Sequence, residues 1–177
     1  MRTLGPGSIS SVLKIILDIF YVVLWVFFIG LAAMALLAVL LSFNSEFLEG
    51  FIRYTGDDGD EFKATGATIA VGLGAFALYA GGVLLIVGRL RRIFVTLTAG
   101  DPFHPDNVRR LRVIGLILAA LELGRYVFIA VSAWLPGISR ANQGFSFTAW
   151  FSVLVIFVLA EVFREGARLR SEAELTI

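Results

Sequence analysis

The chain has 177 residues, of which 58% are hydrophobic and 16% charged, and its formal net charge is +1. Soluble domains have roughly 45–50% apolar and about 25% charged residues. A domain of this size cannot bury so much apolar surface, so lipid must cover much of it. A chain without cysteine and with one histidine excludes disulfides, thiolate nucleophiles and a histidine-based metal cage. The nearly neutral charge gives no indication of direct nucleic-acid binding.

Four apolar segments are long enough to cross a bilayer core about 30 Å thick, which takes about 20 helical residues. We expect a single transmembrane domain over 1–177, with helices over about 12–43, 67–95, 108–135 and 145–170 and an outer loop over 44–66. Backbone groups in lipid must pair internally and these segments lack strand-like alternation, so helices are predicted. The predicted fold class is an all-α membrane protein with four transmembrane helices, a short helical cytoplasmic loop and a C-terminal helical extension.

The first segment is uncharged from Ile19 to Leu41, and no small-residue cleavage site follows it, so it is not interpreted as a cleaved signal peptide. In the loop that follows, Ser45–Tyr54 places apolar residues on one helical face and charged residues on another. This pattern predicts a short helix on the outer membrane surface. The acidic run Asp57–Glu61 does not fit the ligand spacing of a calcium loop, and we interpret it as a solvated turn.

The second segment has small residues seven positions apart, at Ala67, Gly74, Gly81 and Gly88. Such a row lets helix backbones approach closely in lipid, where no hydrophobic force drives association. We expect this row to pack against another helix of the same chain. A seam between two copies, which would make the protein a homo-oligomer, is the alternative.

The third segment is interrupted by Glu122 and Arg125, three residues apart on one helical face and near the expected midplane. Charges at this depth cost at least about 2.5–3.5 kcal/mol and should face protein or water. We expect them to form a pair. This intramembrane pair is either a ligand, ion or proton site or a structural ion pair.

The loop between the second and third segments has specific turn chemistry. Gly100-Asp101-Pro102 marks a turn, and Pro105 suits the first position of a helix whose first turn contains Asp106. His104 is interpreted as a turn residue. The chain after Glu161 has opposite charges three or four residues apart, typical of an exposed helix. Candidate partner-binding residues in these two segments are Asp101, Phe103, Arg109, Arg110, Arg164 and Arg168.

Topology follows from the distribution of the 15 lysines and arginines. If both termini lie inside, eleven fall on the inner side, three on the outer side, and Arg125 lies within a segment. Cytoplasmic loops carry such an excess of positive charge, so we expect a multi-pass protein of the cell inner membrane with both termini cytoplasmic. Asp18 and Glu161, near the inner ends of their helices, are expected to meet arginine side chains.

Two stretches carry a family resemblance: Gly100–Gly115, which reads GDPFHPDNVRRLRVIG, and Leu159–Leu169, which reads LAEVFREGARL, together with the closing Glu174–Ile177. They resemble domain-of-unknown-function family 2975, small bacterial four-helix membrane proteins, over the chain from about the first helix to the end. The family has no assigned activity. Its members are often encoded beside a small helix-turn-helix DNA-binding protein, so the resemblance implies a membrane partner of a transcription factor.

No catalytic motif is present, and no catalytic residue, cofactor or metal site is predicted. We therefore expect a non-enzymatic regulator whose cytoplasmic face binds a cytosolic protein, such as a helix-turn-helix transcription factor. The alternatives are a small transporter, a channel subunit or a ligand sensor that uses Glu122 and Arg125, and a structural subunit of a larger membrane complex.

Overall fold

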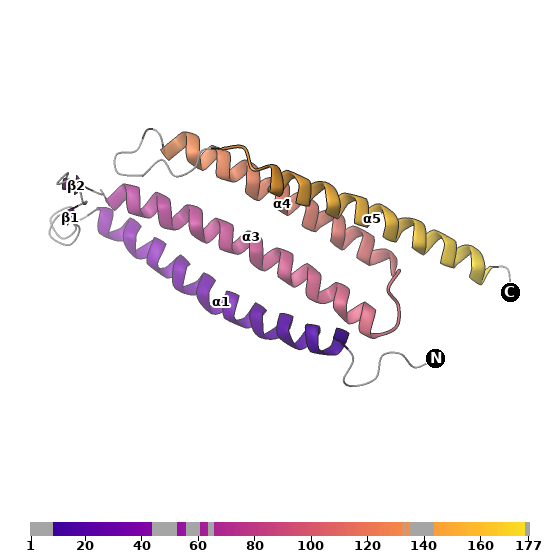
Figure 1. Cartoon of the computed structure of the whole chain (residues 1–177). Helices are drawn as coiled ribbons and strands as arrows, with labels where there is room; N and C mark the ends of the chain where they lie inside the picture. Colours follow the sequence, from indigo (N-terminus) through magenta and orange to yellow (C-terminus); the bar gives the residue numbers. More distant parts are fainter. Residues whose placement is uncertain are drawn as a thin grey trace. The chain divides into compact units, whose positions relative to one another are not determined.

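The computed structural model describes residues 9–43, 53–55, 61–63, 66–132, 134 and 144–175. In this part of the chain there are four long helices, labelled in Figure 1: α1 (Ile9–Ser42), α3 (Gly66–Thr98), α4 (Pro105–Ser132) and α5 (Phe147–Glu174). They contain 28 to 34 residues each. At 1.5 Å per residue, even the shortest is about 42 Å long. Each is therefore longer than the hydrocarbon core of a bilayer, which is about 30 Å thick.

All four helices are long and apolar enough to cross a membrane. In their most apolar stretches only 11% to 17% of the residues are buried inside the protein. Most of the apolar side chains on these helices therefore face outward, where lipid has to cover them. The prediction of an all-α membrane protein with four transmembrane helices is confirmed.

A small hairpin lies between α1 and α3. Its strands β1 (Arg53–Thr55) and β2 (Glu61–Lys63) pair antiparallel. The predicted surface helix over Ser45–Tyr54 is wrong at its carboxyl end, where its last two residues belong to β1; its other residues lie outside the described ones, as do 57–60. Five residues, 56–60, separate the two strands in the sequence.

The chain divides into two compact units. Unit 1 contains Met1–Leu24, Gly82–Glu122 and Ser146–Ile177, and unit 2 contains Trp25–Gly81 and Leu123–Phe145. Unit 1 thus holds the first part of α1, the second part of α3, most of α4 and all of α5. It also holds the connector, which we define as residues 99–104 between α3 and α4.

In unit 1, α3, α4 and α5 share a hydrophobic core. Ile93 of α3, Leu111 and Ile114 of α4, and Ala160 of α5 are at most 4% exposed and contact one another. A glycine on α4 lets the helices come close: a Cβ at Gly115 would lie 3.1 Å from the Phe157 ring of α5. The partly buried residues packed around this core are Ile86, Leu97, Leu118, Ile156 and Phe163.

Aromatic rings of α1 pack against the small-residue row of α3. In unit 2 a Cβ at Gly81 would lie 3.2 Å from the Phe28 ring, and in unit 1 a Cβ at Gly88 would lie 3.5 Å from the Tyr21 ring. A Cβ at Gly74 would have no described atom within 4 Å, and nothing is described of the Ala67 side chain. Two of the predicted glycines therefore face a neighbouring helix of the same chain.

The connector begins and ends with helix caps. Gly100 has φ +84°, its N–H donates to the Leu97 carbonyl, and the Asp101 N–H donates to the Thr96 carbonyl. This is the Schellman arrangement that ends many helices. At the other end His104 accepts the Asp106 N–H on its Nδ1 at 3.2 Å. The interpretation of His104 as a turn residue and of Pro105 as the first residue of α4 is confirmed.

Asn107 holds the two caps together and is fully buried. Its Nδ2 donates to the Thr96 hydroxyl at 2.8 Å and to the Pro102 carbonyl at 3.1 Å. Its Oδ1 accepts from Arg110 Nη1 at 2.9 Å, and the same nitrogen donates to the Arg92 carbonyl at 3.0 Å. The amide therefore links the end of α3, the connector and the first turn of α4.

Gly81→Leu should destabilise the fold by about 1–3 kcal/mol, because a bulky side chain at a close contact forces neighbouring groups apart. Gly74→Leu, on the same helix, is the matched control and should have little effect. Thermal unfolding of the purified protein in detergent measures both. Equal stability of the two variants would contradict the contact between Gly81 and Phe28.

Asn107→Ala should lower the free energy of unfolding by about 1–3 kcal/mol, because it leaves buried polar partners unsatisfied. Asp106→Ala changes the neighbouring residue, which is 61% exposed in its side chain and whose carboxylate lies 3.7 Å from Arg110. This control should lose less than about 1 kcal/mol. If thermal unfolding in detergent shows the same midpoint for both variants, the buried amide has no special role.

Candidate functional site

The most highly charged part of the described chain is one end of unit 1. We define the charged end as residues 9–18 of α1, 89–98 of α3, the connector, 105–112 of α4 and 161–174 of α5. In Figure 1 these segments lie at the same end of the helices. The helix stretches 66–88 and 147–160 that lead to it contain no charged residue. The charged end therefore begins where the helices leave the apolar layer.

The connector is docked on α5. A Cβ at Gly166 would lie only 2.5 Å from the Phe103 ring, so the ring covers the bare backbone of α5 at this glycine. The same ring lies 5.7 Å from the Phe163 ring. Asp101 accepts a hydrogen bond from Arg170 Nη1 at 2.5 Å. Two side chains of the connector are thus fastened to two successive turns of α5.

Both carboxylates expected to meet arginines do so. Asp18 of α1 accepts from Arg91 Nε of α3 at 2.5 Å. Glu161 of α5 pairs with Arg164 on the same helix, and its second oxygen lies 3.8 Å from Arg112 of α4. These pairs connect neighbouring helices where they leave the apolar layer. They confirm the expectation for Asp18 and Glu161.

The six candidate partner-binding residues fall into two groups. Asp101 and Arg110 make hydrogen bonds within the chain, and Phe103 is 38% exposed with one side of its ring on α5. Arg109, Arg164 and Arg168 are exposed. Within the part of the chain that the structure describes, Arg168 pairs along its own helix, with Glu165 and Glu172. Of the six residues, these three arginines therefore present their charge to solvent.

The intramembrane residues differ in their surroundings. Glu122, in unit 1, is 8% exposed. Arg125, in unit 2, donates to the Gly144 carbonyl at 3.2 Å and lies over the Tyr126 ring at 4.6 Å. The two residues belong to different units, and their mutual pairing stays a prediction. Among the described residues, no group of three or more His, Cys, Asp or Glu side chains is placed to hold a metal ion.

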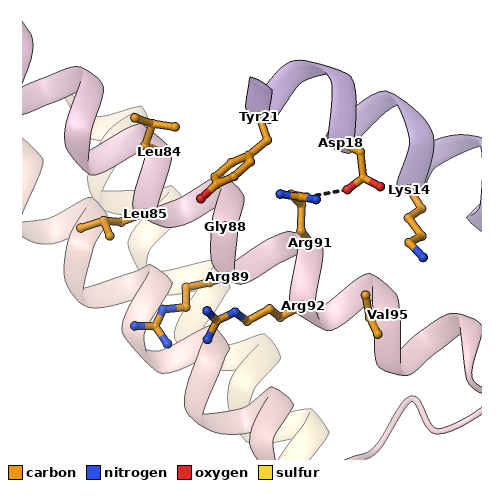
Figure 2. A pocket seen from close by; sticks show the side chains of 10 residues that line it. All are labelled: Lys14, Asp18, Tyr21, Leu84, Leu85, Gly88, Arg89, Arg91, Arg92 and Val95. Carbon is orange, nitrogen blue, oxygen red and sulfur yellow. Dashed lines mark hydrogen bonds and ion pairs between the residues drawn. The ribbon is translucent and has the colours of Figure 1, made fainter. Parts of the chain in front are cut away.

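Sequence reasoning missed a hollow of about 510 Å³ between α1 and α3, shown in Figure 2. Its lining includes Lys14, Arg89 and Arg92, which were counted only as topology signals. It also missed the docking of Phe103 on Gly166. The sequence places these two residues 63 positions apart, and no periodicity connects a loop residue to a distant glycine.

The two stretches that carry the family resemblance contact each other. Phe103 and Arg112 belong to the first stretch, and Gly166 and Glu161, their respective partners, belong to the second. A family model described as protein of unknown function (DUF2975) matches residues 53–177. The chain belongs to this family. The DUF2975 match includes both stretches, which contact each other through the connector, α4 and α5.

The DUF2975 match begins at β1 and includes α3, α4 and α5, whereas α1 precedes it. The resemblance predicted from the sequence is confirmed for this part of the chain. Searches of curated proteins and of solved structures gave no match. A function for this chain therefore has to be inferred from the contacts and exposed charges of the charged end.

The docking of Phe103 predicts a specific non-additivity. In a Phe103→Ala background, Gly166→Ala should stabilise α5, because alanine is favoured over glycine in a helix by about 1 kcal/mol. In the wild-type background the new methyl group would collide with the ring. The effect of Gly166→Ala on unfolding should therefore be less favourable there, by about 1–3 kcal/mol.

Thermal unfolding of the four proteins in detergent measures this cycle. Gly124→Ala is the control, since a Cβ at Gly124 meets no described atom within 4 Å. It should have the same effect with and without Phe103. A purely additive cycle for Gly166 would show that the ring does not dock there.

Proposed function

We propose that this DUF2975 protein is a non-enzymatic regulator of the bacterial inner membrane whose charged end faces the cytoplasm and binds a cytosolic protein. The orientation rests on the excess of lysine and arginine at this end. The family resemblance suggests a helix-turn-helix transcription factor as the partner. The observation that carries the proposal is an exposed, charged surface formed by the start of α4 and the end of α5. An ion pair and packing contacts hold these two segments together.

Rigidity is the first support for this proposal. The connector is capped at both ends, linked through buried Asn107, and fastened to α5 by Phe103 and Asp101. Immobilising side chains and loops opposes binding. A surface whose backbone is already held in place loses less conformational freedom when a partner binds. Its internal contacts therefore favour recognition of a folded protein.

The composition of the exposed surface is the second support. Arginine is enriched in binding hot spots, and Arg109, Arg164 and Arg168 are all exposed. Leu169, beside Arg168 on α5, is 55% exposed. α5 is about 42 Å long, so about eight of its residues extend beyond a 30 Å apolar layer into water. Arg168 and Leu169 lie in that extension.

Site-specific photo-crosslinking in intact cells tests the proposal. A photoreactive amino acid at Arg109 or Arg168 should capture a soluble protein, identified by mass spectrometry. Leu154 is the matched control, because it is 58% exposed on α5 but belongs to the apolar stretch. The same probe there should capture lipid or membrane protein only. Failure to capture a soluble protein at any position of the charged end would contradict the proposal.

An arginine variant measures the strength of the interaction. Arg168→Ala should weaken binding of the identified partner at least about fivefold, as expected for a hot-spot arginine. Its exposed ion pairs contribute less than about 1 kcal/mol, so folding should be unaffected. Glu122→Gln should leave binding unchanged. If a cell-based assay of the protein's activity lost its signal in Glu122→Gln but not in Arg168→Ala, a transporter or ligand sensor would be supported instead.

A further inference from the structure

The hollow between α1 and α3 is formed by one face of each helix. Lys14, Asp18 and Tyr21 recur every three or four residues on α1, and so share a face. From α3 come residues at the same kind of spacing: Leu84, Leu85, Gly88, Arg89, Arg91, Arg92 and Val95. Gly88 has no side chain, which leaves space beside the Tyr21 ring. Figure 2 shows the Arg89 and Arg92 guanidinium groups side by side, with Lys14 on the opposite side of the view next to Asp18.

One of the four cations in the hollow already has partners. Arg91 donates to Asp18 at 2.5 Å and lies over the Tyr21 ring at 4.4 Å. Among the residues that the structure describes, no carboxylate lies within ion-pair distance of Lys14, Arg89 or Arg92. The hollow therefore has four cations against one carboxylate. Arg89 and Arg92, which lie side by side in Figure 2, repel each other, and a bound anion relieves that repulsion.

The lining changes from charged to apolar along α3. Arg89 ends the uncharged stretch 66–88 on α3, and Asp18 precedes the uncharged stretch that begins at Ile19 on α1. The hollow thus lies at the depth where the apolar layer meets the lipid headgroups. Leu84 and Leu85 are one turn further into the apolar stretch, and Leu85 is 57% exposed. The site combines cations for a phosphate with an apolar surface for an acyl chain.

We propose that this hollow binds an anionic phospholipid, with its phosphate beside Arg89 and Arg92, an acyl chain along Leu84 and Leu85, and Lys14 adding positive charge on the α1 side. Basic pockets between transmembrane helices bind anionic lipid headgroups in this way. A free phosphate ion has the same charge chemistry but gains nothing from the leucines. The position at the membrane interface and the apolar side of the lining therefore favour the lipid. The site does not depend on the cytosolic partner.

The test uses the purified full-length protein in a neutral detergent, with phosphatidylglycerol, phosphatidylcholine and inorganic phosphate as separate probes. Phosphatidylglycerol should raise the thermal unfolding midpoint and appear as a bound lipid in native mass spectrometry. Phosphatidylcholine and inorganic phosphate at the same concentration should do neither. Equal binding of the two lipids would overturn the proposal, and so would an equal effect of inorganic phosphate, which would assign the hollow to a free anion.

Two triple variants separate the hollow from general positive charge. Lys14→Gln with Arg89→Gln and Arg92→Gln should weaken phosphatidylglycerol binding at least roughly tenfold. Arg109→Gln with Arg164→Gln and Arg168→Gln removes the same charge from exposed positions outside the hollow and should leave binding within about twofold. Equal losses in the two variants would overturn the proposal.

A third variant controls for folding. Lys14→Arg with Arg89→Lys and Arg92→Lys keeps every charge and should retain binding. If the glutamine triple variant does not fold, the single substitutions Arg89→Gln and Arg92→Gln replace it, each with an expected severalfold loss. Wild-type affinity in both single variants would show that these cations do not hold the lipid.

Discussion

The absence of water from the bilayer core is the constraint on which the rest of this structure depends. Lipid tails are as apolar as leucine, so packing leucines together inside the bilayer gains little from the hydrophobic effect. The buried cluster formed by Ile93, Leu111, Ile114 and Ala160 instead lies next to the charged end. Water is close at this depth, and burial stabilises there. The buried cluster of unit 1 therefore lies where its helices leave the apolar layer.

The connector extends this stabilisation beyond the apolar layer. A turn exposed to water could remain loosely held, yet here a Schellman cap, a histidine cap and the buried Asn107 amide define its backbone. Phe103 and Asp101 then attach it to α5. Most of the specific residues in this stretch are thus used to fold the chain. Arginines that point outward, rather than the turn itself, are what a partner would meet.

The positive charges of this end have more than one task. In the sequence, their number at one end of the helices indicates which side of the membrane that end faces. In the structure several are paired with carboxylates of the chain, among them Arg91, Arg112, Arg164, Arg168 and Arg170. Lys14, Arg89 and Arg92 instead line the hollow between α1 and α3. Cations that pair with carboxylates between helices are thus distinct from those that the proposed lipid would contact.

Sequence alone determined the four helices, because a stretch of about 20 apolar residues has no other stable form in lipid. It also determined where α4 begins, since Pro105 and Asp106 suit the first turn of a helix for local reasons. It predicted that Asp18 would meet an arginine but not which one. The strand at Arg53–Thr55 was missed because the amphipathic spacing of Ser45–Tyr54 was interpreted as a helix.

Only the tertiary structure decided which residues meet across the chain. The contact of Phe103 with Gly166, the burial of Asn107 between α3 and α4, and the hollow beside Gly88 all join segments that sequence patterns treat separately. Periodicity shows which face of a helix a residue occupies, but not which helix that face will meet. That choice depends on side-chain shapes and on where bare glycine backbone allows a ring to approach.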